Sequence, residues 1–119
     1  MEPDFDLNRD FIIFNLLLGW EIIYFSKKGN KLTIRLREFR EKPTRYIRVT
    51  FTQCAFAVIL DFNKRQTDDL SLFNFKGCIF YRAEIEGDRI VNIHLLREKE
   101  LGGALKIQPL GISFDFTSR

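Results

Sequence analysis

The chain of 119 residues is 45% hydrophobic and 29% charged, which is the ordinary balance of a globular domain. Its net charge is +3, and because Lys and Arg are interleaved with Asp and Glu, this charge permits nucleic-acid binding without indicating it. The apolar run over residues 11–25 is broken by Asn15, Gly19 and Glu21, so it is too short to span a bilayer. We expect a single domain over residues 1–119 with no membrane partner.

Residues 7–18 predict a short α-helix that packs on a sheet. Apolar side chains recur there at steps of three and four residues, at Leu7, Phe11, Phe14 and Leu18. Gly19 follows, and glycine suits the left-handed conformation that ends a helix. A strand through residues 11–14 is the alternative, because this run is rich in Ile and Phe.

Residues 20–37 predict a β-hairpin around which the rest of the chain is built. Its second arm alternates strictly, with Leu32, Ile34 and Leu36 on one face and Thr33, Arg35 and Arg37 on the other. This alternation predicts one face toward the core and one polar face.

The register of this hairpin depends on the length of its loop. Gly29-Asn30 suits a two-residue turn, which pairs Phe25 with Ile34 and Ile23 with Leu36. A four-residue loop instead pairs Phe25 with Leu32 and Ile23 with Ile34. In either register the apolar face includes Ile23 and Phe25, and the other face carries Trp20, Ile22 and Tyr24.

Residues 45–62 predict strand structure with a break in the middle. The bulky apolar positions are odd up to Phe51 and even from Phe56 onward. Because a one-residue shift exchanges the two faces of a strand, this change predicts a bulge, bend or turn near Gln53 and Cys54.

Residues 78–85 and 89–96 predict a second hairpin. A three-residue loop over 86–88 would pair Ala83 with Val91 and Tyr81 with Ile93. After a solvated turn over 97–100 and a flexible Gly102-Gly103 link, residues 105–108 and 112–116 predict two last short strands.

These elements predict a mainly β fold, an antiparallel sandwich, roll or partly open barrel with one N-terminal helix packed on the sheet. The last strand is expected at a sheet edge, with Ile112, Phe114 and Phe116 on one face. Asp115 protects that edge only weakly, which favours a homodimer through it. The alternative is a monomer in which the strand pairs only within its own sheet.

The sequence contains no pattern that indicates catalysis or a cofactor. His94, Cys54 and Cys78 lack metal-ligand spacing, and no glycine-rich phosphate loop opens a helix. Both cysteines lie in apolar runs, so we expect reduced, unreactive thiols in the cytoplasm. We therefore expect no metal, no cofactor and no catalytic residue, and an enzyme is the weaker interpretation.

The first candidate binding surface combines Trp20 and Tyr24 with Arg35 and Arg37. Trp, Tyr and Arg are favoured at binding hot spots, and the same side chains can stack unpaired bases. The other interpretation is that the helix over 7–18 covers Trp20, which would then belong to the core.

The second candidate surface is a polar patch on the second hairpin, formed by Arg82, Glu84, Asn92 and His94. It is either an ordinary solvated sheet face or a recognition patch with a pH-sensitive member.

The order of a short helix, the stretch Leu-Leu-Gly-Trp-Glu-Ile, a hairpin and then Phe-rich strands resembles that of small bacterial proteins that include some toxin-immunity domains. This resemblance is one of layout and transfers no site residue. We expect a small non-catalytic module that docks on another protein, with immunity-type inhibition as one version. The alternative is a single-stranded nucleic-acid-binding module. The net charge of +3 argues against inhibition of a basic nuclease, which needs an acidic inhibitor.

Overall fold

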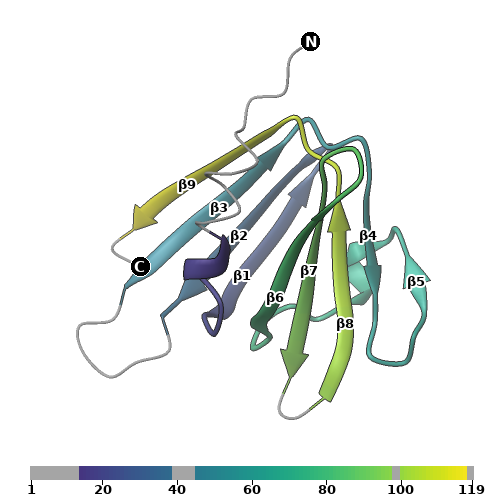
Figure 1. Cartoon of the computed structure of the whole chain (residues 1–119), viewed down its shortest axis with the longest axis horizontal. Coiled ribbons are helices and arrows are strands. Elements are labelled where there is room, and N and C mark those ends of the chain that lie inside the picture. Colours follow the sequence, from purple (N-terminus) through teal and green to yellow (C-terminus); the bar gives the residue numbers. More distant parts are fainter. Residues whose placement is uncertain (1–13, 39–44, 98–99, 118–119) are drawn as a thin grey trace.

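The computed structural model describes residues 14–38, 45–97 and 100–117, which form one β-sheet preceded by a helical turn (Figure 1). Its strands are β1 (Glu21–Lys28), β2 (Lys31–Arg37), β3 (Tyr46–Thr52), β4 (Ala57–Leu60), β5 (Gln66–Thr67), β6 (Ile79–Glu86), β7 (Ile90–Arg97), β8 (Glu100–Ile107) and β9 (Gly111–Thr117). A 3₁₀ turn, η1 (Leu70–Leu72), lies between β5 and β6. The predicted mainly β, antiparallel class is confirmed.

The predicted N-terminal helix lies largely outside the described residues. Within them, residues 14–16 are helical. Gly19 has a φ of 90°, the left-handed conformation expected of the residue that ends a helix. The described end of the segment therefore agrees with the helical interpretation rather than with a strand.

The strands follow the order β5-β4-β8-β7-β6-β1-β2-β3-β9, and each pairing between neighbours is antiparallel. Within the described residues β5 and β9 do not pair, so the sheet stays open and does not close into a barrel. As predicted, the C-terminal strand lies at a sheet edge.

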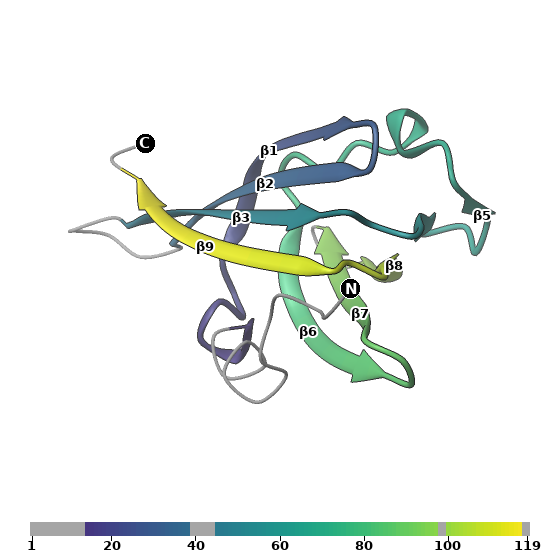
Figure 2. The same ribbon diagram turned by 90° about the horizontal axis from the view of Figure 1, so that it is seen from above.

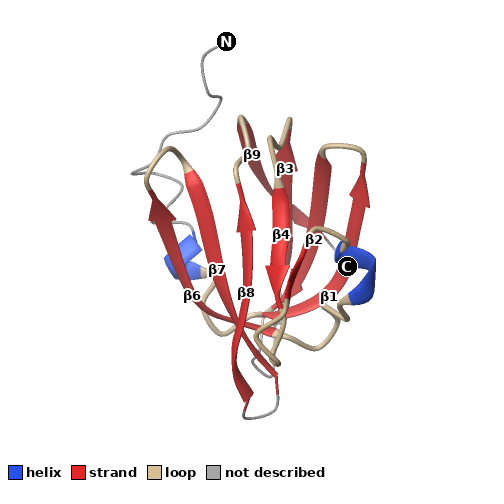
Figure 3. Ribbon diagram, turned by 90° about the vertical axis from the view of Figure 1, so that its right-hand side faces the viewer, coloured by secondary structure: helices blue, strands red, loops and turns tan. Residues whose placement is uncertain are grey.

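The sheet divides into two halves at the boundary between β1 and β6. These strands pair only at Glu21 and Ile79, and the sheet bends there (Figures 2 and 3). We call β1, β2, β3 and β9 the first half, and β6, β7, β8, β4 and β5 the second half. The inner faces of the two halves enclose the core.

The core is formed by the apolar side chains that alternate along the strands and point to the inner faces of both halves. Its fully buried members include Leu32, Ile34 and Leu36 of β2 and Val91, Ile93 and Leu95 of β7, as the sequence predicts. The helical turn adds Phe14, whose ring stacks on Phe51 at 6.1 Å between centroids and meets Phe114 edge-on at 5.3 Å. Each such side chain stabilises the fold by about 1.5–3 kcal/mol.

The first hairpin closes with the two-residue loop Gly29-Asn30, since Lys28 pairs with Lys31. Gly29 has a φ of 60°, the sign that the first central residue of a type II′ turn requires. Phe25 lies opposite Ile34, as this loop predicts.

A β-bulge in β1 changes which of its side chains face the core, so the predicted faces of this hairpin were partly wrong. The register shifts between Ile22 and Tyr24, so Ile22 rather than Ile23 lies opposite Leu36. Ile22 is fully buried, whereas Ile23 is only partly buried. The expectation that Ile22 shares the polar face with Tyr24 was therefore wrong.

A second bulge lies between Phe80 and Arg82 in β6. It turns Phe80 into the core and leaves Tyr81 52% exposed, so the predicted pairing of Tyr81 with the buried Ile93 was wrong. In both bulges the two candidate residues are apolar, so the alternation of the sequence does not show where the shift falls.

The second hairpin has a three-residue loop, as predicted, but one position further along the chain. Glu86 pairs with Ile90, so the loop is 87–89, with positive φ at Gly87 and Arg89. Ala83 consequently lies opposite Ile93 rather than Val91.

The predicted break within residues 45–62 is confirmed. Gln53 has a φ of 50°, and residues 53–56 connect β3 to β4 without strand structure. Because β3 belongs to the first half and β4 to the second, the chain crosses between the halves at this point.

Strand β8 begins well before the predicted strand over 105–108. Arg97 pairs with Glu100 across antiparallel strands, so the predicted chain reversal over 97–100 is confirmed, whereas Gly103 pairs with Leu95, so the predicted flexible link was wrong. A Cβ atom on Gly103 would lie 3.1 Å from the ring of Phe62. Glycine at this position lets that ring pack against the strand.

Candidate functional site

The outer face of the first half carries rows of polar side chains that run across its strands. In one row Tyr24 lies opposite Arg35, Arg35 opposite Arg48, and Arg48 opposite Asp115. The next row consists of the hydroxyl side chains Ser26, Thr33, Thr50 and Ser113. These rows form because polar residues alternate with buried ones along each strand.

Part of this face is a hollow of about 240 Å³, which we call the basic hollow. Its lining residues are Tyr24, Ser26, Lys28, Lys31, Thr33, Arg35 and Arg48. Four of these are basic and none is acidic. Among the described residues, none of the four basic side chains takes part in an ion pair.

Arg35 lies at the middle of the basic hollow and is partly buried. Its Nη2 atom is buried and has no hydrogen-bond partner within the described part of the chain. Leaving a buried donor without an acceptor costs about 1–3 kcal/mol. Because this atom is buried, an external carboxylate or phosphate oxygen would supply the missing acceptor only after the guanidinium turns outward.

Trp20, a member of the first predicted surface, is 7% exposed and belongs to the core. The guanidinium of Arg45 lies 5.6 Å from the centroid of its ring. Arg45 donates hydrogen bonds of 3.1 and 2.6 Å to the Glu38 carboxylate, which raises the pKa of Arg45. Of the two interpretations of Trp20, the structure therefore supports the core.

The other members of that surface lie on the outer face, in different surroundings. Tyr24 is 46% exposed and lies opposite Arg35. Arg37 lies on the other side of the Tyr24–Arg35 row from the hydroxyl side chains and forms an ion pair with Glu21. The structure thus brings Tyr24 and Arg35 together, while the charge of Arg37 is already compensated.

Three basic residues of the hollow, Lys28, Lys31 and Arg48, were not among the predicted site residues. The sequence does indicate that Arg48 lies on the outer face, because it alternates with the apolar residues Ile47 and Val49. What the sequence lacked was the pairing of β3 with β2, which places Arg48 beside Arg35.

The structure brings the four residues of the second predicted patch together on the outer face of β6 and β7. Arg82 lies opposite His94, and Glu84 lies opposite Asn92. Glu84 forms an ion pair of 2.5 Å with Arg82, and its other oxygen lies 3.6 Å from Nε2 of His94.

Glu86 extends this network toward β8. It accepts a 2.9 Å hydrogen bond from the buried Asn92 and lies 3.5 Å from the Lys106 ammonium group. The hydrogen bond from Asn92 is the main reason why the pKa of Glu86 is lowered. The charges of the second patch therefore compensate one another.

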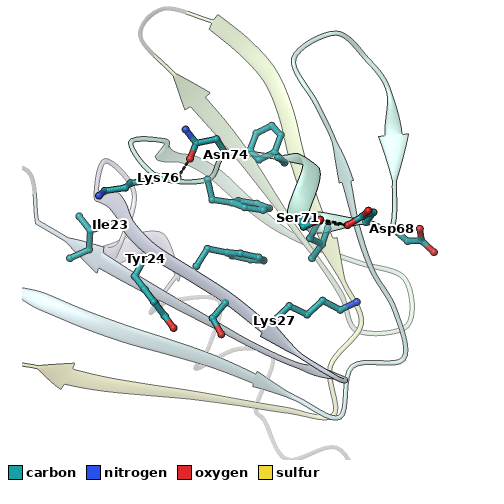
Figure 4. A pocket seen from close by; sticks show the side chains of 13 residues that line it. Ile23, Tyr24, Lys27, Asp68, Ser71, Asn74 and Lys76 are labelled. Atoms are coloured by element: carbon teal, nitrogen blue, oxygen red, sulfur yellow. Dashed lines mark hydrogen bonds between the residues drawn. The ribbon is translucent and has the colours of Figure 1, made fainter.

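A larger hollow, of about 590 Å³, opens between β1 and the segment of residues 68–76 (Figure 4). We call it the β1 wedge. Its aromatic wall includes Phe25 and Phe75, stacked at 3.9 Å between ring centroids, and Phe73, 4.7 Å from Phe75.

Arg97 holds the far wall of the β1 wedge in place. Its guanidinium lies 5.2 Å from the centroid of Phe73 and 5.1 Å from that of Phe62, and it donates to the carbonyl oxygen of Asn74. Cation–π contacts and a hydrogen bond from one side chain restrain this wall.

Cys54 and Cys78 are both free thiols. Burial raises the pKa of Cys54 to about 11, although the nearby Lys27 opposes the shift. Burial also raises the pKa of Cys78, against the opposing effect of Arg97. Both groups are neutral near pH 7, which makes them poor nucleophiles and poor metal ligands.

Within the described ranges, no three side chains of His, Cys, Asp or Glu come together as a metal site. No helix in that part of the chain is long and apolar enough to cross a bilayer.

Comparison with protein-family models, with curated proteins and with solved structures gives no significant match. Similarity therefore assigns no class to the chain, and the layout resemblance to toxin-immunity domains stays a prediction. The geometry of the surfaces is the basis for a functional argument.

Proposed function

We propose that this protein is a non-catalytic binding module that docks on an acidic surface of a partner protein through the basic hollow. The observation that supports the proposal is a hollow with four basic side chains and, within the described residues, no carboxylate in its lining and no internal ion pair. Complementary charge guides such encounters and disfavours partners of the wrong sign.

Arg35 and Arg48 are the proposed anchors of this docking. They lie opposite each other on β2 and β3, and a planar guanidinium can bind a carboxylate through two parallel hydrogen bonds. The partly exposed ring of Tyr24 would supply apolar contact area beside them. The hydroxyl groups of Ser26 and Thr33 would bind further carboxylate or carbonyl oxygens.

Binding of single-stranded nucleic acid is the alternative, since phosphates also suit a basic surface. Binders of this kind stack successive bases on several aromatic rings. Of the described residues that line the basic hollow, Tyr24 is the one that is aromatic, and Trp20 lies in the core. This shortage of stacking rings favours a protein partner. Immunity-type inhibition of an acidic target would be one form of the proposed docking.

A direct test compares two probes of equal net charge, a labelled peptide rich in Glu and Asp and a mixed-sequence single-stranded oligonucleotide. We expect the peptide to bind, and Arg35→Glu to weaken that binding by about tenfold, which corresponds to ~1.4 kcal/mol. Arg65→Glu is the matched control, because Arg65 is exposed in the turn between β4 and β5. Preferential binding of the oligonucleotide, with loss on Tyr24→Ala, would favour the alternative, and equal effects of both reversals would refute the proposal.

Self-association through β9 is a second proposal, carried by its position at a sheet edge. Phe116 on this strand is 70% exposed, whereas Phe114 packs against Phe14. We expect a homodimer that Phe116→Lys weakens without unfolding the monomer. Sedimentation equilibrium checks this, and a single 14.1 kDa species at high concentration would contradict it.

The free state of both thiols supports a reducing, cytoplasmic setting for this docking.

A further inference from the structure

Within the described part of the chain, the β6-side edge of β1 lacks a strand partner over most of its length. Glu21 pairs with Ile79, and Ile22 bonds to the backbone of Gly77 and Cys78. Beyond Ile22, the described residues offer no backbone hydrogen bond to β1 other than those from β2. The edge is therefore open within the sheet, at the point where the two halves separate.

The register of the hairpin shows which backbone groups of β1 are left unpaired. A two-residue loop closes on a residue pair that exchanges both hydrogen bonds, here Lys28 and Lys31. Because such pairs alternate along an antiparallel ladder, Ser26 and Tyr24 also bond to β2. The N–H and C=O groups of Phe25 and Lys27 then point away from β2, toward the wedge.

This open edge forms one side of the β1 wedge, and the segment of residues 68–76 forms the other (Figure 4). The volume of about 590 Å³ falls within the ~300–1,000 Å³ of typical ligand pockets. The unpaired N–H and C=O groups along this edge are the groups that an extended chain binds in strand addition. An extended chain here could form hydrogen bonds with the unpaired N–H and C=O groups of β1 and contact the aromatic wall of Phe25 and Phe73.

We propose that the β1 wedge binds an extended peptide segment of a partner protein, which adds as a strand to the open edge of β1 at Phe25 and Lys27. Strand addition takes its affinity from backbone hydrogen bonds and its specificity from alternate side chains. The residue opposite Phe25 would point to the aromatic wall, so a large apolar side chain is expected there.

The charges at the two ends of the wedge define the flanking residues of this peptide. Lys76 lies beside Ile23 at one end, and Asp68 lies at the other end, beyond Lys27 (Figure 4). A complementary peptide therefore has a carboxylate near Lys76, a large apolar residue in the middle and a basic residue near Asp68 and Asp69. This site is distinct from the basic hollow, although Tyr24 and Ser26 contribute to both rims.

Hydrogen exchange measured residue by residue on the free protein tests whether the edge of β1 is open. The amides of Tyr24, Ser26 and Lys28 should exchange slowly, and those of Phe25 and Lys27 should exchange fast. Slow exchange at Phe25 and Lys27 in the free monomer would mean that the chain itself fills the edge. Slow exchange only in a dimer would assign the edge to a second copy. Either result overturns the proposal.

A library of displayed heptapeptides tests whether an extended peptide binds at this edge. Selection on the wild-type protein, with counter-selection on Lys27→Pro, should yield peptides with the acidic, apolar and basic pattern described above. Proline removes the outward N–H of Lys27 and is tolerated at strand edges. Lys27→Ala, which keeps this N–H, separates the loss of the side chain from the loss of the N–H and should bind the selected peptides at least about tenfold more tightly than Lys27→Pro.

Peptides with N-methyl groups keep the test valid on the wild-type protein, should Lys27→Pro fail to fold. Methylation of the alternate residues whose amides face β1 should weaken binding about tenfold or more, and methylation in the other phase should not. The selected peptide should also slow exchange at Phe25 and Lys27. A library without any edge-dependent peptide, or equal effects of both methylation phases, would overturn the proposal. Neither result depends on Arg35, so this site and the basic hollow can fail separately.

Discussion

The outer faces of the two halves carry similar side chains but differ in whether the described residues pair their charges. On β6–β8, Arg82 pairs with Glu84, and Lys106 lies beside Glu86. On β1–β3, Lys28, Lys31, Arg35 and Arg48 line one hollow without an acidic neighbour among its lining residues. Under the proposed function, charges without internal partners mark the binding face, rather than the number of charged residues. A surface whose charges lack internal partners can gain more from a ligand than one whose charges are already compensated.

The largest expected effect concerns the joint between the halves. Trp20 bonds through its backbone oxygen to Phe80 of β6, and its ring is buried. Trp20→Ala should lower the free energy of unfolding by about 3–5 kcal/mol, and both faces should unfold in one transition. Leu16→Ala, at a position 71% exposed in the same segment, should change it by less than about 0.5 kcal/mol. Denaturant titration checks this, and a small loss for Trp20→Ala would place its ring outside the core.

The comparison itself is tested by matched charge reversals on the two faces. Arg35→Glu with Arg48→Glu should weaken binding of the acidic peptide by about tenfold or more, while Arg82→Glu leaves it unchanged. The reason is that Arg82 already pairs with Glu84. Fluorescence anisotropy over a salt series measures both, and the wild-type affinity should fall with salt. Equal losses from the two faces would erase the distinction between them.

The converse experiment removes the carboxylates that compensate the basic side chains on the outer face of β6–β8. Glu84→Gln with Glu86→Gln removes both carboxylates but keeps an acceptor for Asn92. Stability should fall only slightly, because exposed ion pairs contribute little to it. Arg82 and Lys106 are then free to bind the acidic peptide, so weak binding should appear on β6–β8. If this variant binds no better than wild type at that face, compensation is not what separates the two surfaces.

The two thiols lie in connecting segments, Cys54 between β3 and β4 and Cys78 directly before β6, and they give the smallest expected effect. The pKa of Cys54 is raised to about 11, above the ~8.5 of an unfolded chain, so the fold favours the neutral thiol. Its contribution to stability is complete below about pH 8.5 and is lost as the pH rises to about 11. In Cys78→Ala, alkylation of Cys54 should stay slow at pH 8 and accelerate toward pH 11. Rapid alkylation of native Cys54 at pH 8 would show that the thiol is exposed.

Much of the fold could be predicted from alternation and turn chemistry, because both act locally. The loop Gly29-Asn30, the buried face of β2 and the break after β3 follow from neighbouring residues alone. The bulges could not be located, because Ile22 and Ile23, or Phe80 and Tyr81, suit a buried position equally well.

The candidate site was only partly predictable for a different reason. Tyr24 and Arg35 lie on adjacent arms of one hairpin, so their proximity follows from a short-range turn. Arg48 joins them only through the pairing of β2 with β3. Trp20 was ambiguous because an aromatic residue beside a turn suits both a core and a surface.

The most direct test of the unequal faces is an NMR titration that observes the side-chain Nε–H groups of the arginines with the acidic peptide as probe. The account predicts progressive shifts for Arg35 and Arg48 and none for Arg82, with neighbouring backbone shifts confined to β1, β2 and β3. Shifts at Arg82, with Arg35 and Arg48 unaffected, would contradict it.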